Sequence, residues 1–119
     1  MNLTEIIGKT ILKIEGDFNS EEISFLLSNG EKYVLKHNQN CCETVLIDDI
    51  VGDLKDLLYK PLLEATCRYK DGKDDECTSS TWTFFHFATI KGYVTITWYG
   101  ESNGYYSESA EIIHLGTFK

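Results

Sequence analysis

The sequence predicts an α+β fold, in which a strongly twisted antiparallel sheet of about seven strands carries one main helix. Residues 81–90 and 93–99 are long aromatic segments separated only by Lys91-Gly92, which predicts a hairpin. Residues 48–60 repeat apolar side chains at helical spacing, which predicts the helix. The chain of 119 residues, 42 % of them hydrophobic, has the size of one domain with one core. We therefore expect a single domain over residues 1–119.

The N-terminal third is expected to supply three short strands. Residues 3–8 predict one helical turn that ends at a glycine, and residues 10–15 alternate as a first strand. Residues 22–28 and 31–37 predict a hairpin, because the Asn29-Gly30 between them is the dipeptide that type I′ turns prefer, with a positive φ at both residues. Three strands are therefore expected before the helix.

The main helix is expected to begin after Ile47 and to end at Pro61, which cannot continue a helix. Asp48 or Asp49 can cap its first turn, and the helix dipole favours both residues and Asp53 near the N-terminus. These aspartates are therefore first interpreted as residues that stabilise the helix. Its apolar face would consist of Ile50, Val51, Leu54, Leu57 and Leu58.

The C-terminal half is expected to supply four more strands. Residues 62–69 predict one strand, and the charged residues 70–76 predict a solvated hairpin tip. The hairpin of 81–90 and 93–99 continues through a glycine-rich turn into a strand at 105–113, and the remaining residues form a tail. The expected arrangement of these last three strands is an antiparallel meander.

The first aromatic strand is apolar on both faces. Alternation places Trp82, Phe84 and His86 on one face, and Phe85 and Phe87 on the other. A strand of this kind is usually central and covered on both sides. Because only one helix is expected, a homodimer or a partner protein is a plausible cover for the second face, and His86 is interpreted as a core histidine.

Charge and composition exclude several classes of function. The net charge of −8 disfavours binding to nucleic acid over a broad surface and favours basic partners. No apolar run has the length of a membrane-spanning helix, and the first residues do not resemble a signal peptide, so a cytoplasmic protein is expected. Reduced thiols are expected for the four cysteines, Cys41, Cys42, Cys67 and Cys77.

Cys41, Cys42 and Glu43 form the first candidate binding site. They follow His37, so that two thiols, one imidazole and one carboxylate lie within seven residues. A zinc site is disfavoured, because adjacent cysteines point in different directions and no second pair has the spacing of a zinc finger. We expect a structural connection, or a polar group presented into a pocket, and no metal.

The second candidate is the glycine-rich hairpin tip with its flanking aromatic residues. Small residues let a ligand approach the backbone, while Trp and Tyr offer flat faces with polar tips. The segment lacks the lysine and the following helix of a phosphate-binding loop, and a purely structural hairpin is the alternative. The candidate binding residues are Trp98, Tyr99, Ser102, Asn103, Tyr105 and Tyr106.

Enzyme activity is not expected. The chain has no Gly-x-Ser-x-Gly motif, it has only three histidines, and no pair of its carboxylates has a context that indicates acid and base roles. We therefore assign no catalytic residue and no cofactor.

Several joined segments resemble a family of small uncharacterised proteins that is widespread in tailed phages and prophages. The resemblance covers almost the whole chain and departs from the family at residues 67–79. It implies a phage setting and a binding protein without catalysis that acts on host machinery. The segments that carry it are Ile6–Ile11, Cys41–Glu43, Ile47–Leu54, Thr81–Phe84, Ala88–Ile96, Trp98–Gly100 and Ser102–Glu108.

Within this setting the leading hypothesis is a counter-defence inhibitor. Its acidic surface would occupy the nucleic-acid channel of a host defence effector, such as a CRISPR nuclease. The alternative is a sponge that sequesters a small nucleotide signal in an aromatic pocket, and a phage housekeeping or structural role is the second alternative. The acidic surface would consist of Asp48, Asp49, Asp53 and Asp56, with Asp71, Asp74, Asp75 and Glu76.

Overall fold

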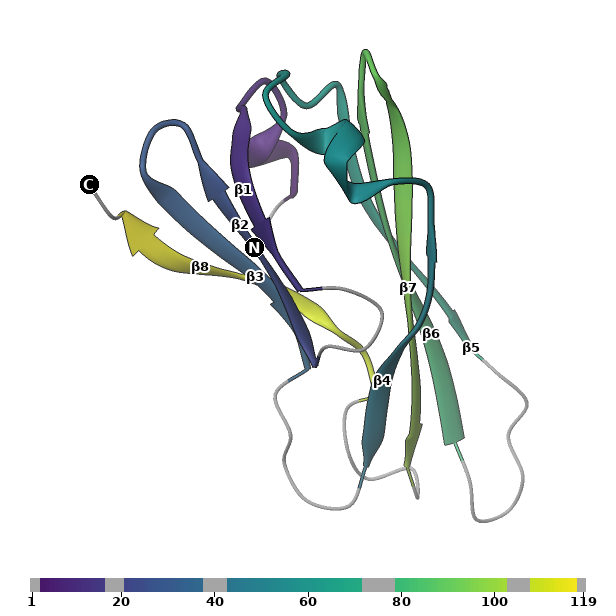
Figure 1. Cartoon of the computed structure of the whole chain (residues 1–119). Helices are drawn as coiled ribbons and strands as arrows, with labels where there is room; N and C mark the ends of the chain where they lie inside the picture. Colours follow the sequence, from purple (N-terminus) through teal and green to yellow (C-terminus); the bar gives the residue numbers. More distant parts are fainter. Residues whose placement is uncertain (1–2, 17–20, 38–42, 72–78, 103–107, 118–119) are drawn as a thin grey trace.

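Two four-stranded antiparallel sheets pack face to face in the computed structural model, which describes residues 3–16, 21–37, 43–71, 79–102 and 108–117 (Figure 1). The first sheet has the strand order β1-β2-β3-β8, and the second has the order β4-β7-β6-β5. The strands are β1 (Ile11–Glu15), β2 (Glu22–Leu27), β3 (Glu31–Lys36), β4 (Thr44–Val51), β5 (Glu64–Asp71), β6 (Ser79–Thr89), β7 (Gly92–Ser102) and β8 (Glu111–Thr117), and two short 3-10 helices are η1 (Leu3–Ile6) and η2 (Leu54–Leu57).

The core lies between the inner faces of the two sheets. Phe25 of β2 meets Phe87 of β6 edge to face, with ring centroids 5.3 Å apart, and both side chains are fully buried. Burying a side chain of this size contributes about 1.5 to 3 kcal/mol. The sheets diverge at one end, and η1 and η2 lie near this end (Figure 1). Leu3, Ile6 and Leu57 of these helices join the core.

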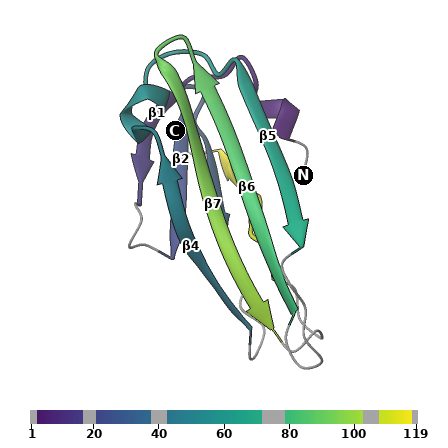
Figure 2. The same ribbon diagram turned by 90° about the vertical axis from the view of Figure 1, so that its right-hand side faces the viewer.

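The outer face of the second sheet is not covered by any other described element. Figure 2 looks onto this face, with β4, β7, β6 and β5 side by side. Antiparallel sheets commonly leave one face to solvent, where polar side chains are the rule. Here Trp82, Phe84, Tyr93 and Tyr99 lie on that face instead, as the alternation of buried and exposed positions in β6 and β7 shows.

The predicted α+β class is wrong, because the described residues contain no α-helix. Residues 44–51 form β4 at the edge of the second sheet, and only the four residues of η2 are helical in the expected helix. A bulge between Ile47 and Asp49 explains the error. One extra residue separates Ile47 from the next inward apolar residue, Ile50, so that the apolar positions have the three-residue spacing of a helix.

The predicted meander is also wrong in its third strand. β6 and β7 pair as predicted, whereas β8 begins only at Glu111 and pairs with β3 of the first sheet. Residues 108–110 cross from one sheet to the other, and the backbone carbonyl of Glu108 lies so close to Gly100 that a Cβ there would collide with it. The hairpin of β2 and β3 is confirmed, but Gly30 has a positive φ (+90°) and Asn29 does not, so its turn is not type I′.

No helix in the described part of the chain is long and apolar enough to cross a membrane.

Candidate functional site

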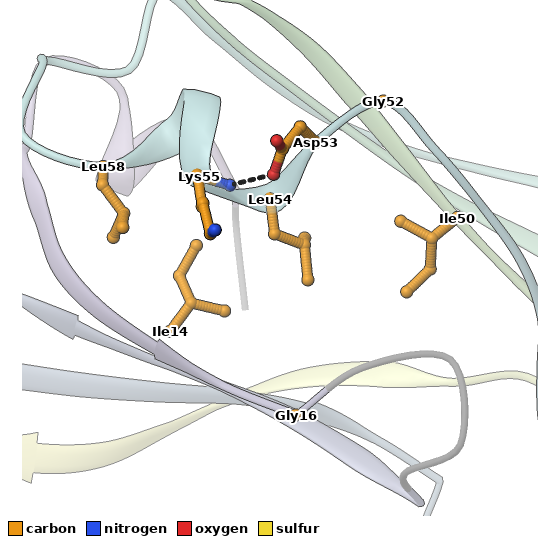
Figure 3. A pocket seen from close by; sticks show the side chains of 8 residues that line it. All are labelled: Ile14, Gly16, Ile50, Gly52, Asp53, Leu54, Lys55 and Leu58. Carbon is orange, nitrogen blue, oxygen red and sulfur yellow. Dashed lines mark hydrogen bonds between the residues drawn. The ribbon is translucent and has the colours of Figure 1, made fainter.

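A cleft opens between the edge strands β1 and β4, beneath η2 (Figure 3). We call it the β1–β4 cleft, and its volume is about 700 Å³. Ile14 points into it from β1, Ile50 from β4, and Leu54 and Leu58 from η2 and the residue after it (Figure 3). Gly16, Gly52, Asp53 and Lys55 complete its lining. The cleft therefore offers apolar walls with polar groups at the margin.

Two local features of the sequence shape this cleft. The bulge in β4 turns Ile50 inward, and Gly52 then ends the strand with φ +97°, where a Cβ would collide with the backbone carbonyl of Tyr93. Asp53 caps η2, because its carboxylate accepts a hydrogen bond of 2.9 Å from the backbone N–H of Lys55. The cap and the glycine hold η2 over the open end of the sandwich.

Acidic residues follow the β4 edge beside the cleft. Asp48 and Asp49 are exposed in and after the bulge, and Asp53 is exposed at the cap of η2. Asp56 is half-buried within η2, close to Gly92. These four aspartates belong to the predicted acidic surface, and the structure places Asp48, Asp49 and Asp53 along one edge of the second sheet, whereas Asp56 lies beside the turn between β6 and β7. Asp71 lies at the end of β5, on the opposite edge.

The outer face of the second sheet carries a group of large apolar side chains, most of them aromatic. The rings of Trp82 and Tyr99, on neighbouring strands, lie 4.5 Å apart, and Tyr93 and Leu46 are each 57 % exposed. The hydroxyl of Tyr99 donates a 2.6 Å hydrogen bond to Glu101, and this bond raises the pKa of Tyr99. We call the group of Leu46, Trp82, Phe84, Tyr93 and Tyr99 the outer aromatic face.

A shallow hollow of about 300 Å³ lies at one side of this face. Arg68 of β5 and Phe84 of β6 line it, together with Thr66, His86 and Thr95. The imidazole of His86 is held between the hydroxyl of Thr95, at 3.0 Å, and the carboxylate of Glu64, at 3.2 Å. His86 was interpreted as a core histidine, but it lies half-buried on the outer face.

Glu43 is the described member of the first predicted site, and it is buried. Its carboxylate lies 3.0 Å from Nε2 of His37, and Nδ1 of the same ring lies 2.9 Å from the backbone carbonyl of Ser109. The side chains of Glu43 and His37 are 0 % and 4 % exposed, so the hydrogen bond between them is shielded from water. The pair joins the end of β3 to the start of β4, and a hollow lined by Glu21 and Thr44 adjoins it.

The second predicted site is divided by the pleat of β7. Tyr99 lies on the outer face, whereas Trp98 lies in the core with 1 % of its surface exposed. Ser102 is also buried, and its hydroxyl donates a hydrogen bond to Glu108. The structure therefore does not bring these three residues to one surface. The other predicted residues, Cys41, Cys42, Asn103, Tyr105, Tyr106, Asp74, Asp75 and Glu76, lie outside the described residues.

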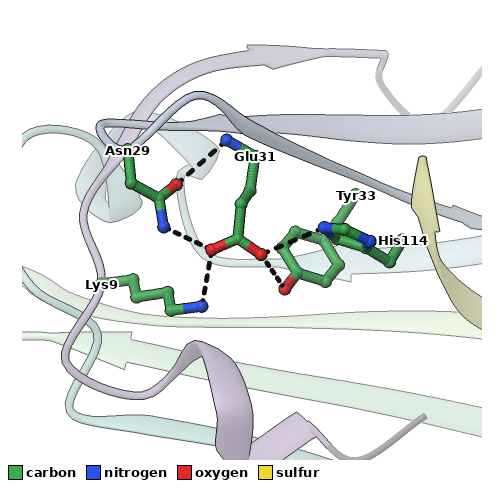
Figure 4. A network of polar contacts seen from close by, with 5 residues as sticks. All are labelled: Lys9, Asn29, Glu31, Tyr33 and His114. Carbon is green, nitrogen blue, oxygen red and sulfur yellow. Dashed lines mark hydrogen bonds and ion pairs between the residues drawn. The ribbon is translucent and has the colours of Figure 1, made fainter. Parts of the chain in front are cut away.

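A polar network that the sequence did not indicate surrounds Glu31 (Figure 4). Its carboxylate accepts hydrogen bonds from Lys9 at 2.7 Å, from Tyr33 at 2.8 Å and from Asn29, and it pairs with His114 at 3.0 Å. The hydrogen bond from Lys9 is the largest cause that lowers the pKa of Glu31 to about 2. Burial, followed by the bond to Glu31, raises the pKa of Tyr33 to about 12. All the polar groups of the network point at one carboxylate, which suits a structural anchor.

The described residues offer little for metal or covalent chemistry. Among them, no three His, Cys, Asp or Glu side chains gather as a metal site. Cys67 is half-buried and free, and burial raises the pKa of its thiol, which disfavours the nucleophilic thiolate.

Residues 4–112 match a family model described as a domain of unknown function, DUF7448. The chain belongs to this family. The DUF7448 match spans every described strand up to the beginning of β8. This confirms the prediction of an uncharacterised family. No curated protein and no solved structure matches the chain.

Part of the candidate site could have been predicted from the sequence. The acidic run 48–56 was recognised, but its interpretation as a helix N-terminus concealed the cleft beside it. Arg68 carries no local signal, because only the pairing of β5 with β6 places it beside Phe84. The β-branched residues Val45, Ile47, Ile50 and Val51 were the available signal for a strand.

Proposed function

We propose that the protein is a non-catalytic binding protein whose β1–β4 cleft and acidic β4 edge receive a basic segment of a partner protein. The cleft is the observation that carries this proposal. Its walls of Ile14, Ile50, Leu54 and Leu58 suit the aliphatic stem of an inserted Arg or Lys side chain, and Asp53 at the margin suits the cationic head.

Charge supports a basic partner over an acidic one. The net charge of −8 attracts cationic surfaces at a distance, and Asp48, Asp49 and Asp53 concentrate negative charge beside the cleft. Among the described residues that line the cleft, Lys55 is the only basic one. Its loss should therefore not weaken the proposed complex.

The resemblance to phage proteins supplies the partner class. A protein from a phage that attracts basic surfaces can block the nucleic-acid channel of a host defence effector, and a CRISPR nuclease is the first effector to test. In this proposal the protein competes with the nucleic acid for the channel and changes no covalent bond. It works in the cytoplasm of the host cell.

The test compares two double variants. Asp48→Ser/Asp53→Ser removes two charges from the β4 edge, and serine retains an oxygen that can cap η2. Glu64→Ser/Asp71→Ser removes two charges from the β5 edge and is the control. Tagged protein should capture a host effector from lysate and co-elute with it on gel filtration. The captured effector should no longer bind nucleic acid. The β4-edge variant should lose this effect, and so should the wild type in high salt.

Two results would contradict the proposal. An effector retained equally by both variants would show that the β4 edge is not the contact. If the wild type captured no nucleic-acid-binding protein from a host lysate, the inhibitor function would be refuted.

The nucleotide sponge is the second candidate, and the hollow beside Arg68 favours it. Phe84 offers a ring for a base, and the guanidinium of Arg68 offers donors for a phosphate. A nucleotide screen should then raise the melting temperature of the wild type and not that of Arg68→Met. No shift with any nucleotide, or an equal shift in both proteins, would refute the sponge.

A further inference from the structure

The outer face of the second sheet carries Arg68, Lys70 and Glu64 on its β5 edge and Asp49 on its β4 edge, and Glu101 lies near the end of the central strand β7. Strand pairing places Arg68 of β5, Phe84 of β6, Thr97 of β7 and Asp49 of β4 in one row across the sheet. Both charged residues are exposed and lie at opposite ends of this row. The neighbouring row runs from Lys70 through Trp82 and Tyr99 to Leu46.

Such a row complements itself under a two-fold rotation. If a second sheet lies on the first and the axis runs parallel to the strands, each row faces the same row of the other copy in reverse order. Arg68 of one copy then faces Asp49 of the other, and this contact occurs twice. We propose that a second copy of this chain docks on the outer aromatic face, in an isologous dimer with the axis parallel to β6 and β7.

The composition of the face agrees with that of a protein interface. Aromatic residues are enriched at the cores of interfaces and charged residues are depleted there, whereas rims are polar. The positions on β6 and β7 that face outward between the edges are Ser80, Trp82, Phe84, His86, Ala88, Tyr93, Thr95, Thr97, Tyr99 and Glu101, of which only Glu101, near the end of β7, is an acid or a lysine or arginine. The charges of Arg68, Lys70, Glu64 and Asp49 lie on the edge strands and that of Glu101 lies near the end of β7, where a rim would be.

The outer face of the first sheet differs in the way expected of a surface in water. Its outward positions on β1, β2 and β3 include Lys13, Glu15, Ser24 and Lys32, and among the described residues it carries no aromatic side chain. The aromatic character is thus specific to one face.

The area of the face reaches the lower end of the range for a specific dimer, about 1,200 Å² buried in total. β6 and β7 have 11 residues each, and β4 and β5 have 8 each. At ~3.3 Å per residue and ~4.8 Å between strands, the face covers roughly 600 Å², before side-chain relief is added. A standard interface buries about 800 Å² per partner.

The test uses two charge reversals that repel in their own dimers and attract each other. In the Arg68→Asp homodimer, the new aspartate of each copy faces Asp49 of the other, so two acidic pairs repel. In the Asp49→Arg homodimer, the new arginine of each copy faces Arg68 of the other, so two basic pairs repel. Each reversal should weaken dimerisation roughly tenfold to thirtyfold, from two exposed pairs changed from attraction to repulsion. A mixture of the two variants should form a heterodimer of wild-type affinity, because both contacts then join opposite charges.

The readout is the mass in solution, measured by analytical ultracentrifugation over a concentration series up to about 100 μM, at which complexes with micromolar Kd are mostly assembled. Lys60→Asp, on an exposed residue between η2 and β5, makes the same charge change away from this face and should leave the dimer intact. Circular dichroism confirms that each variant is folded, and a reversal that does not fold is replaced by Arg68→Ser or Asp49→Ser, which should weaken the dimer by a smaller factor.

Three results would overturn the proposal: a monomeric wild type, a dimer that neither reversal weakens, and variants that do not combine. A monomer would leave the face to a partner protein or to a nucleotide. The proposal is independent of the β1–β4 cleft, since the Asp48→Ser/Asp53→Ser variant should still dimerise.

Discussion

Replacing Glu108 tests how the chain passes from one sheet to the other. The carboxylate of Glu108 is buried and accepts hydrogen bonds from the hydroxyls of Ser79, at 3.1 Å, and Thr81, at 2.9 Å, both on β6. Ser102 at the end of β7 donates a third. Because three hydroxyls donate to it, the carboxylate fixes the crossing residues against the second sheet.

We predict that Glu108→Gln lowers the free energy of unfolding by about 2 to 3 kcal/mol. A hydrogen bond to a charged group contributes about 1.5 to 3 kcal/mol and a neutral one about 0.5 to 1.5 kcal/mol, so three weakened bonds cost roughly 3 to 4 kcal/mol. Part of this loss is offset, because an amide is less costly to bury than a carboxylate. Glu108→Ala removes all three acceptor contacts and should cost more.

Urea unfolding, followed by the fluorescence of the buried Trp98, measures this loss. The midpoint should fall by about 1 to 2 M with an unchanged slope. Glu111→Gln is the control, since Glu111 is exposed three residues further along and its replacement should cost less than about 0.5 kcal/mol. If Glu108→Gln were as stable as the control, or if its loss were the same in a Ser102→Ala background, the carboxylate would not be the anchor that we infer.

Three further predictions concern other polar and backbone features. The folded-state pKa of Glu31, about 2, lies below its ordinary value of 4.5, so the stability that wild type gains over Glu31→Gln should be full above pH 4.5 and disappear as the pH falls towards 2, measured by unfolding across that range. Glu43→Gln should lower the free energy of unfolding by at most about 1.5 kcal/mol, because an amide can donate to Nε2 of His37. Glu43→Ala leaves a buried ring nitrogen unpaired and should lower it by about 2 to 4 kcal/mol. Equal losses of stability in the two variants, measured by urea unfolding, would show that the hydrogen bond to His37 does not stabilise the fold. Gly52→Ala should lower the melting temperature by several degrees, since both the positive φ and the carbonyl of Tyr93 exclude a Cβ, and a variant as stable as wild type would refute that reasoning.

Part of the candidate site was predictable and part was not. The acidic run beside Ile47 was visible as a property of the chain, and so was the aromatic character of residues 82–99. The cleft was not predictable, because it exists only where Ile14 and Ile50, distant in sequence, face each other across the gap between two sheets. Arg68 and Asp49 share a row for the same reason: strand order places them there, and sequence spacing does not record strand order.

Local patterns determined the positions of most strands, the hairpin around Gly30 and the first helical turn, because alternation and turn-forming residues act over a few neighbours. Tertiary structure decided the rest. The bulge after Ile47 gave a strand the apolar spacing of a helix, and β8 pairs with β3 of the first sheet after a crossing segment that Glu108 holds against β6. Both outcomes depend on contacts between segments that are far apart in the chain, and an alternation pattern holds no information about such partners.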